Sequence, residues 1–333
     1  MEPKNNSENK EIEYHESITD PNELKILEDF KHSIATITNK KDKAVLNPFV
    51  LLDNDFLICF LRARKLNVQK ATRMLLDYYH WKAKINLDDL YTNFVFKEKY
   101  RLQLLFPHGF HKYTKEGNPI YFQVMGKLNP DELFKIGTPE DLIKYSVRIN
   151  ESMEREYFKM CSKIKNKYVH GVFNLIDFRD IKTTSLLNKK LLTYLKESFR
   201  ICQDCYPEFL AGCFVINAGF AFRSFYSAVK LFLDVKTREK VKVYGENYRE
   251  GLLDKVDADC LPSFWGGSCQ CPGGCLFSNA GPWQKNEKEE IPEEILRGRN
   301  ELNNYMLNAK NSKTDNEEKI KNTGKEGINP DNL

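Results

Sequence analysis

YVHGVFNLID, at residues 168–177, is a short run of β-branched and aromatic residues of the kind that forms a buried strand. Three more runs have the same character: PIYFQVMG at 119–126, FLAGCFVIN at 209–217 and KVKVYG at 240–245. Stretches with helical spacing of apolar residues separate them, at 139–163, 184–205 and 221–234. Strands that alternate with helices need crossover connections, so we expect an α/β fold with a mostly parallel sheet.

A different pattern precedes these strands. Asp20-Pro21-Asn22-Glu23 is a helix start, and Asp53 and Asn67 stand where two further helices should begin. The sequence therefore predicts four parts: a disordered N-terminus at 1–19, an all-helical unit at 20–105, an α/β domain at 106–284, and a polar, largely disordered tail at 285–333. A short helix around Glu293 to Leu307 is expected within that tail.

Composition restricts the possible classes of protein. The 333 residues are 41% hydrophobic, which is too much for a chain disordered throughout. No run approaches the ~20 apolar residues of a membrane-spanning helix, and the first 17 residues contain no apolar segment, so we expect neither a membrane span nor a secretory signal. The nine cysteines fit reduced thiols in the cytosol. The net charge is +4, yet both ends are acidic, which leaves about +10 on residues 21–284 and indicates an anionic partner.

Catalytic motifs are missing from the sequence. It contains no phosphate-binding glycine loop, no nucleophile elbow and no zinc-protease motif, so an enzyme is the weakest hypothesis. Asp177 ends a predicted strand, where catalytic groups often lie, but we interpret it as a structural residue that binds backbone amides of the next loop. His108, His111 and His170 have no partner pattern and are also interpreted as structural.

Cysteines are concentrated in two places. Cys269, Cys271 and Cys275 form one tight group, and Cys202 and Cys205 form another. A four-cysteine zinc site has two paired ligand sets with a longer spacer, whereas these two sets fall in different predicted elements. A reduced turn without metal is therefore the favoured interpretation, and zinc is the alternative.

Several motifs together resemble the CRAL-TRIO lipid-binding family, in its fungal and plant phosphatidylinositol transfer branch. The match covers about residues 25–285, with the motifs in order. It is carried by FLICFLRARKLNV at 56–68, Trp81-Lys82, GNPIYF at 117–122, Tyr206-Pro207-Glu208, VINA at 215–218, FLD at 232–234, LPSFWGG at 261–267, GGC at 273–275 and GPW at 281–283. The resemblance implies that the helical unit packs on an α/β lipid-binding domain with a mobile gate helix.

The resemblance also implies two sets of lipid-binding residues. The headgroup set, which would bind inositol phosphate, is Arg64, Lys65, Glu208, Thr237 and Lys240. The gate set, an aromatic stripe that would face the acyl chains behind a hinge, is Gly219, Phe222, Phe225, Tyr226, Val229 and Phe232. Five positions depart from the family's phosphatidylcholine site, which predicts weak or absent phosphatidylcholine binding: Phe110, Asn150, Val172, Asn174 and Phe209.

The resulting expectation is a non-enzymatic, monomeric carrier that binds and transfers phosphatidylinositol. It would act in the cytoplasm, contact anionic internal membranes transiently, and support phosphoinositide synthesis, in part by presenting lipid to a phosphatidylinositol kinase. Its ligand would be the phospholipid, with no cofactor, metal or nucleic acid. The alternatives are a carrier of a sterol or tocopherol-like ligand, and a module that senses lipid without transferring it.

Overall fold

The computed structural model describes residues 18, 20–47, 49–284 and 290–317. The expected disordered segment 1–19 therefore lies outside the described residues except for Ile18, as does the end of the tail at 318–333.

The strands are β1 (His108–Tyr113), β2 (Pro119–Val124), β3 (Val172–Asp177), β4 (Leu210–Ile216) and β5 (Val241–Val243). The helices before β3 are α1 (Pro21–Ala35), α2 (Lys40–Val45), α3 (Asn54–Ala63), α4 (Val68–Lys84), α5 (Leu87–Asn93), α6 (Lys99–Leu105), α7 (Pro130–Ile136), α8 (Pro139–Ser152) and α9 (Phe158–Lys165). The later helices are α10 (Thr183–Leu186), α11 (Lys189–Cys205), α12 (Phe220–Val229), α13 (Val235–Glu239), α14 (Arg249–Lys255) and α15 (Glu293–Glu317).

The five strands form one sheet in the order β1-β2-β3-β4-β5. The pairs from β2 to β5 are parallel, which confirms the predicted α/β class, and β1 pairs with β2 antiparallel. The four predicted runs all contain strands. The sequence patterns do not predict β1, because HGFHKY is largely polar and has no apolar run.

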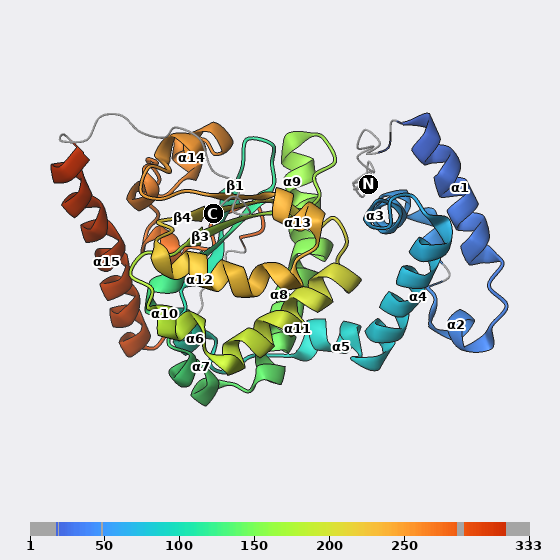
Figure 1. The fold of residues 1–333 in the computed structure, drawn as a ribbon, viewed down its shortest axis with the longest axis horizontal. Helices are drawn as coiled ribbons and strands as arrows, with labels where there is room; N and C mark the ends of the chain where they lie inside the picture. The colour runs from blue at the N-terminus through green and yellow to red at the C-terminus, as the bar shows by residue number, and fades with distance from the viewer. Residues whose placement is uncertain (1–17, 19, 48, 285–289, 318–333) are drawn as a thin grey trace, which may run out of the picture.

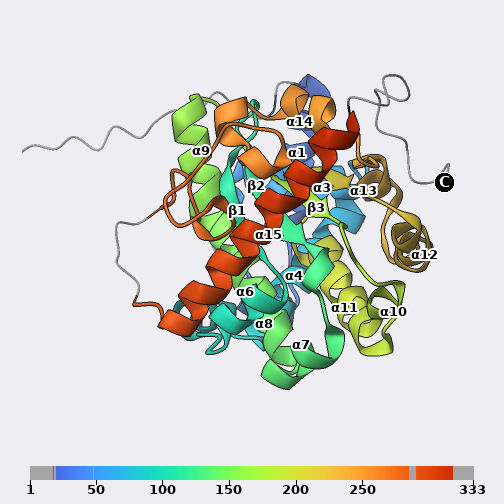
Figure 2. The same ribbon diagram turned by 90° about the vertical axis from the view of Figure 1, so that its left-hand side faces the viewer.

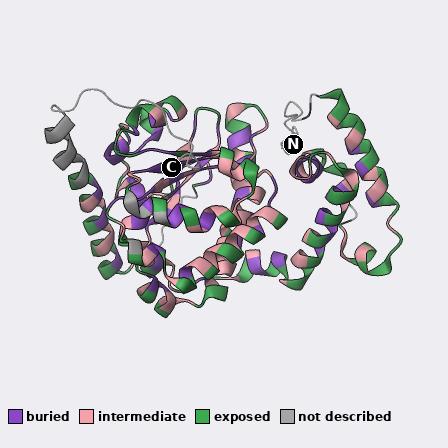
Figure 3. Ribbon diagram, viewed as in Figure 1, coloured by how far each residue is buried: buried purple, intermediate pink, exposed green. Residues whose placement is uncertain are grey.

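Each face of the sheet is covered by a different part of the chain. Phe122, Leu175 and Ile216 point to one face, where they pack with Trp265 and Met306 of the C-terminal segment. Figure 2 shows α15 running across this face. The alternate positions of the strands point the other way, toward α8, α11 and α12. This alternation follows from the two-residue period of a strand and buries the sheet on both sides, as Figure 3 shows.

The helical unit comprises α1 to α4 and has its own apolar core, centred on Phe30, Phe60 and Leu75. Its predicted helix starts are confirmed, since the side chains of Asp20, Asp53 and Asn67 cap α1, α3 and α4. Figure 1 shows this unit to one side of the sheet, joined to it through α5. Trp81 on α4 packs edge-on against Tyr206, with ring centres 6.1 Å apart, and so connects the unit to the α/β part.

Two crossover helices differ in detail from the predicted stretches. The stretch 139–163 is continuous but widens to a π-turn at Met153–Tyr157 between α8 and α9. The stretch 184–205 is interrupted, because the side chain of Asn188 accepts hydrogen bonds from the backbone N–H groups of Lys190 and Leu191 and starts α11 there.

Helix α15 departs most from the expectation of a largely disordered tail. It runs from Glu293 to Glu317, longer than the short helix expected, and Ile295, Leu302 and Met306 are buried. These three side chains lie seven and four residues apart, so they share one face of the helix. No helix in the described part of the chain combines the length and apolar character needed to cross a bilayer.

Candidate lipid-binding site

A pocket of about 460 Å³ lies where α3 meets the segment before β3 and the beginning of β4. Three cationic side chains and one carboxylate line it, together with an imidazole and apolar groups. The lining residues are Ile58, Cys59, Arg62, Lys167, Tyr168, His170, Glu208, Leu210, Ala211 and Lys240. An excess of positive charge in a partly enclosed pocket favours an anionic ligand. Another pocket, of about 410 Å³ near the start of α3, contains none of the predicted site residues.

Glu208 and Lys240 are the two predicted headgroup residues that this pocket brings together. Lys240 Nζ lies 3.7 Å from Glu208 Oε2 and donates a hydrogen bond to the carbonyl of Leu210 at 2.7 Å. Lys236 Nζ approaches the other carboxylate oxygen of Glu208 at 3.6 Å. The Glu208 and Lys240 side chains keep 27% and 32% of their surface exposed, so a ligand can reach both.

The backbone around the pocket is strained. Glu208 has φ of +58°, and Lys65 and Leu66, which follow α3, have φ of +51° and +60°. A non-glycine residue in this left-handed region costs on the order of 1 kcal/mol and persists only where the surrounding structure holds it. Such strain gathers at binding sites, which supports a functional role for the loop that carries Glu208.

Arg64, Lys65 and Thr237 lie outside the lining of this pocket. Arg64 ends α3, and its guanidinium donates to the carbonyl of Ala63. The Thr237 hydroxyl donates to Asp234, which caps α13. Their helices nevertheless meet, because Lys236 Nζ on α13 donates to the carbonyl of Arg62 at 2.9 Å. Figure 1 shows α13 between the sheet and α3.

Sequence reasoning missed three cations at the site: Arg62 and Lys167, which line the pocket, and Lys236, which approaches Glu208. Arg62 is paired with Glu23 of α1, and that hydrogen bond and ion pair lower the pKa of the Glu23 carboxyl. The family motif includes Arg64 and Lys65, which follow Arg62 in the sequence. The helical period would have indicated Arg62, since it follows Ile58 and Cys59 of the pocket by four and three residues.

His170 gives the pocket a neutral polar group. Burial lowers its pKa to about 4, so the ring is uncharged at neutral pH. Its Nε2 atom is buried and has no hydrogen-bond partner within the described residues. A buried polar atom without a partner costs free energy, and a ligand hydroxyl at this position would satisfy it.

Helix α12 and the turn after it carry the predicted gate residues. Phe222, Phe225, Tyr226 and Val229 are buried against Phe178 and the sheet, and Phe232 is half-buried. The Phe178 and Phe222 rings meet edge-on, with centres 5.0 Å apart. The end of the segment is held by Gln203 of α11, whose side-chain amide donates to the carbonyl of Phe232. The aromatic stripe therefore faces inward in this conformation.

Gly219 precedes α12 with φ of −101°, a value that any residue can adopt. A Cβ atom built there would meet no atom of the described residues within 4 Å, its chain neighbours apart. The conformation in this structure therefore does not require glycine at position 219.

The five positions that depart from the family's phosphatidylcholine site separate into two groups. Phe110, Val172 and Phe209 are buried in one apolar cluster with Phe158 and Ile201. The side-chain amide of Asn150 lies 3.7 Å from the sulfur of Cys202, and Asn174 Oδ1 has no hydrogen-bond partner in the part of the chain described. Three of the five thus offer no polar group to a ligand.

The side chains of Asp177 and His108 both have hydrogen-bond partners inside the fold. Asp177 accepts hydrogen bonds from the backbone N–H and the guanidinium of Arg179, from Asn217 and from Trp265. His108 Nδ1 lies 2.7 Å from the carbonyl of Phe106, and its Nε2 lies 3.0 Å from the hydroxyl of Tyr145. These contacts support the structural interpretation of both residues.

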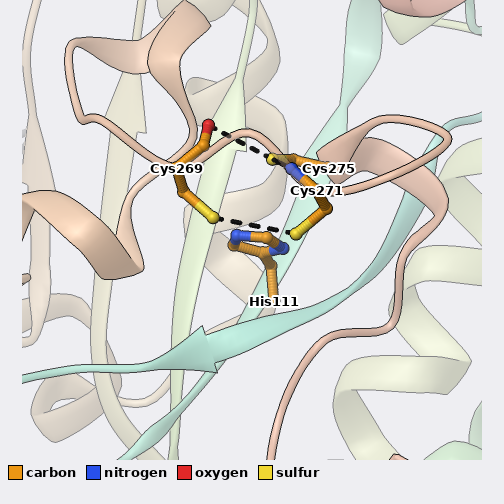
Figure 4. A group of neighbouring side chains, drawn as sticks. All are labelled: His111, Cys269, Cys271 and Cys275. Carbon is orange, nitrogen blue, oxygen red and sulfur yellow. Dashed lines mark hydrogen bonds between the residues drawn. The ribbon is translucent and has the colours of Figure 1, made fainter.

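One further group of side chains could hold a metal ion. The donor atoms of four residues lie within 4.8 Å of one another, and Figure 4 shows these side chains facing a common centre. This cysteine–histidine cluster consists of His111, Cys269, Cys271 and Cys275. The sequence could not pair His111 with the cysteines, because more than 150 residues separate them. Cys202 and Cys205, the other predicted candidates, are on α11 and do not belong to the cluster.

The chain is similar to a known domain family and to two proteins of known name. The profile of the CRAL/TRIO domain matches residues 106–267. The chain is 35% identical over 236 residues to the Sec14 cytosolic factor of Schizosaccharomyces pombe, covering 71% of this chain and 82% of that protein. It is 34% identical over 237 residues to the phosphatidylinositol/phosphatidylcholine transfer protein SFH9 of Arabidopsis thaliana, covering 71% of this chain but only 41% of the plant protein.

A solved structure shows the same fold. The crystal structure of Sfh5 superposes with a TM-score of 0.59 at 16% sequence identity, covering 88% of this chain and all of that one. At this level of identity, the similarity concerns the fold alone.

Proposed function

The chain belongs to the CRAL/TRIO domain family, and from that premise we propose that it binds phosphatidylinositol and transfers it between membranes. The observation that carries the proposal is the cationic pocket with the Glu208–Lys240 pair at its edge. A sterol or tocopherol-like ligand is not favoured, because it has no phosphate to compensate those charges. The plant relative SFH9 is named as a transfer protein, and we propose no catalytic role for this chain.

The headgroup is recognised by complementary charges and hydroxyl contacts. Lys240 and Lys236 lie beside the Glu208 carboxylate and can turn their ammonium groups to the lipid phosphate. Glu208 can then accept hydrogen bonds from inositol hydroxyls, and His170 Nε2 can bind another. Arg64, Lys65 and Thr237 add charge and a hydroxyl group near this pocket in the lipid-bound form.

The acyl chains lie behind the gate helix α12. Opening this helix in water would expose four large side chains, Phe222, Phe225, Tyr226 and Val229, at about 1.5–3 kcal/mol each. That cost keeps the gate closed in solution. Against a bilayer the same side chains meet lipid instead of water, so the membrane itself favours the open state.

Replacing Gly219 by alanine should slow lipid transfer several-fold while the free energy of unfolding changes by less than about 0.5 kcal/mol. The added Cβ meets nothing in the closed conformation, so any effect must arise in another conformation that uses the freedom of glycine. Transfer between vesicles and thermal unfolding are measured together. Gly245→Ala is the matched control, because a Cβ there also meets no atom of the described residues within 4 Å beyond its chain neighbours. Unchanged transfer by Gly219→Ala would exclude the hinge.

Membrane contact is made by the segment between α12 and α13 together with the start of α13. Leu231 and Val235 are 79% and 59% exposed, and Lys236 beside them is half exposed. Exposed apolar side chains beside a cation are suited to binding the surface of an anionic bilayer. The electrostatic attraction between the cation and the bilayer should weaken as salt is added.

Replacing Leu231 by aspartate should weaken binding to vesicles that contain anionic lipid by about fivefold to tenfold. The substitution removes an apolar contact and adds a charge that the bilayer repels. Co-sedimentation with vesicles measures the effect. Leu52→Asp, at a position that is 80% exposed in the helical unit, is the matched control. An equal loss in both variants would mean that Leu231 has no special role in docking.

Transfer of phosphatidylcholine should be at least about tenfold slower than transfer of phosphatidylinositol. The apolar side chains of Phe110, Val172 and Phe209 provide no hydrogen bonds to hold a phosphocholine group. Parallel assays with each labelled lipid, moved between vesicles of the same composition, test this selectivity. Equal rates for the two lipids would contradict it, and transfer of neither would contradict the proposed function.

The wider role follows from this chemistry. We propose that the protein is a monomer that acts in the cytoplasm and contacts internal membranes transiently. Its ligand is a phospholipid, and transfer needs no cofactor. By exposing the headgroup at the pocket, it would support phosphoinositide synthesis by a phosphatidylinositol kinase. Lipid movement between vesicles also separates transfer from lipid sensing, since a sensor would bind lipid without moving it.

A further inference from the structure

The cysteine–histidine cluster lies on the face of the sheet opposite α12. Its cysteines come from the loop after Trp265, and its histidine comes from β1. All four residues are buried except Cys271, which is half-buried. A reduced turn would account for the cysteines. It does not account for the buried imidazole, whose Nε2 atom has no hydrogen-bond partner among the described residues.

The spacing of the donor atoms fits a tetrahedral ion. The sulfurs of Cys269 and Cys271 are 3.7 Å apart. Zinc–sulfur bonds of about 2.3 Å in a tetrahedron place two sulfurs about 3.8 Å apart. Three sulfurs and one imidazole nitrogen are a ligand set that favours zinc over the harder divalent ions.

A second layer of contacts orients the imidazole. His111 Nδ1 lies 3.2 Å from the hydroxyl oxygen of Ser278, and that hydroxyl donates to the carbonyl of Cys275. Because the Ser278 hydroxyl already donates its proton to that carbonyl, its oxygen accepts a hydrogen bond from Nδ1–H of His111. This tautomer leaves the lone pair of Nε2 free for a metal, and metal-binding histidines are usually oriented in this way.

The backbone is also shaped to bring the ligands together. The pairing of β1 with β2 shifts between Phe110 and Tyr113, so His111 and Lys112 occupy a bulge. Lys112 has φ of +53°, and its ammonium lies close to Cys269. A bulge redirects side chains, here toward the cysteines. The lysine charge would balance the single negative charge of one zinc ion with three thiolates.

We propose that the cysteine–histidine cluster binds one structural zinc ion. This reverses the expectation of a reduced turn without metal. The ion ties β1 to the loop that supports α15, where Asn303 donates to the carbonyl of Gly273 at 3.0 Å. A Cβ atom at Gly274 would lie 2.0 Å from the Asn303 side chain, so helix and loop are closely fitted. The zinc site is independent of the lipid pocket and of the proposed transfer function.

Elemental analysis of the full chain, produced without a histidine tag, tests the proposal by measuring the zinc content per chain. Wild type should retain about one zinc ion per chain after dialysis against a weak chelator. Cys271→Ser should retain at least about tenfold less, because it removes one of four ligands. Cys202→Ser, which changes a half-buried cysteine outside the cluster, should retain zinc like wild type. Equal zinc in the wild type and both variants would overturn the proposal.

Cobalt substitution provides a readout that does not depend on the folding of a variant. Wild type stripped of metal should bind one equivalent of Co²⁺ and develop thiolate charge-transfer bands with the visible absorption of a tetrahedral ion. Removing the metal should also make α15 more sensitive to protease. Wild type that is folded, contains no zinc and gives no cobalt–thiolate bands would overturn the proposal.

Discussion

Replacing both Glu208 and Lys240 by alanine should reduce phosphatidylinositol loading by at least about tenfold and leave the fold intact. In the proposed site, Lys240 supplies a cation to the lipid phosphate, and Glu208 holds both Lys240 and Lys236 at the pocket. Hydrogen bonds to charged groups contribute about 1.5–3 kcal/mol each, so losing one or two of them accounts for the size of the effect. Both side chains are partly exposed, and the folded protein should therefore lose little stability.

The measurement is the amount of phosphatidylinositol that co-purifies with the protein, determined by mass spectrometry, together with thermal unfolding. Glu116→Ala combined with Lys255→Ala is a matched control. These residues form an ion pair at 2.9 Å and are also partly exposed, at 48% and 43%, but they do not line the pocket. Both double variants should unfold at nearly the same temperature as wild type. Normal loading of the Glu208 and Lys240 variant would refute the headgroup site.

The fold was predictable because its determinants are local. Apolar runs identify β2 to β5, and side chains such as Asp20 and Asn67 identify the helix starts. The strand β1 was not predictable in this way. Its residues are largely polar, and the buried His108 and His111 have partners later in the chain, among them Tyr145 and Ser278.

The pocket was partly predictable, for the same reason. Glu208 and Lys240 follow from the motif match, and the structure places them together. The ion pair of Lys236 with Glu208 depends on how α13 packs against α3, a tertiary contact that leaves no local signal. The cysteine–histidine cluster was even less predictable from local sequence. The two cysteine sets lie in different predicted elements, which argued against zinc, whereas the proposed fourth ligand, His111, comes from a bulge in a distant strand.

Replacing Asp177 by alanine should lower the free energy of unfolding by about 3–5 kcal/mol. The carboxylate is fully buried and accepts from Arg179, Asn217 and Trp265, which join β3, β4 and the C-terminal segment. Removing it would leave the buried Arg179 guanidinium without its counter-charge, and that uncompensated charge is the main cost. Asp177→Asn keeps the side-chain size but removes the charge, so it should lose nearly as much.

Denaturant unfolding measures the effect, with Asp257→Ala as the control at an exposed aspartate, where the change should stay within about 0.5 kcal/mol. The same variants decide between structural and catalytic roles for Asp177. Below its unfolding temperature, the alanine variant should transfer phosphatidylinositol at the wild-type rate per folded molecule, because Asp177 lies outside the lining of the lipid pocket. Full stability combined with lost transfer would instead place Asp177 in the functional machinery.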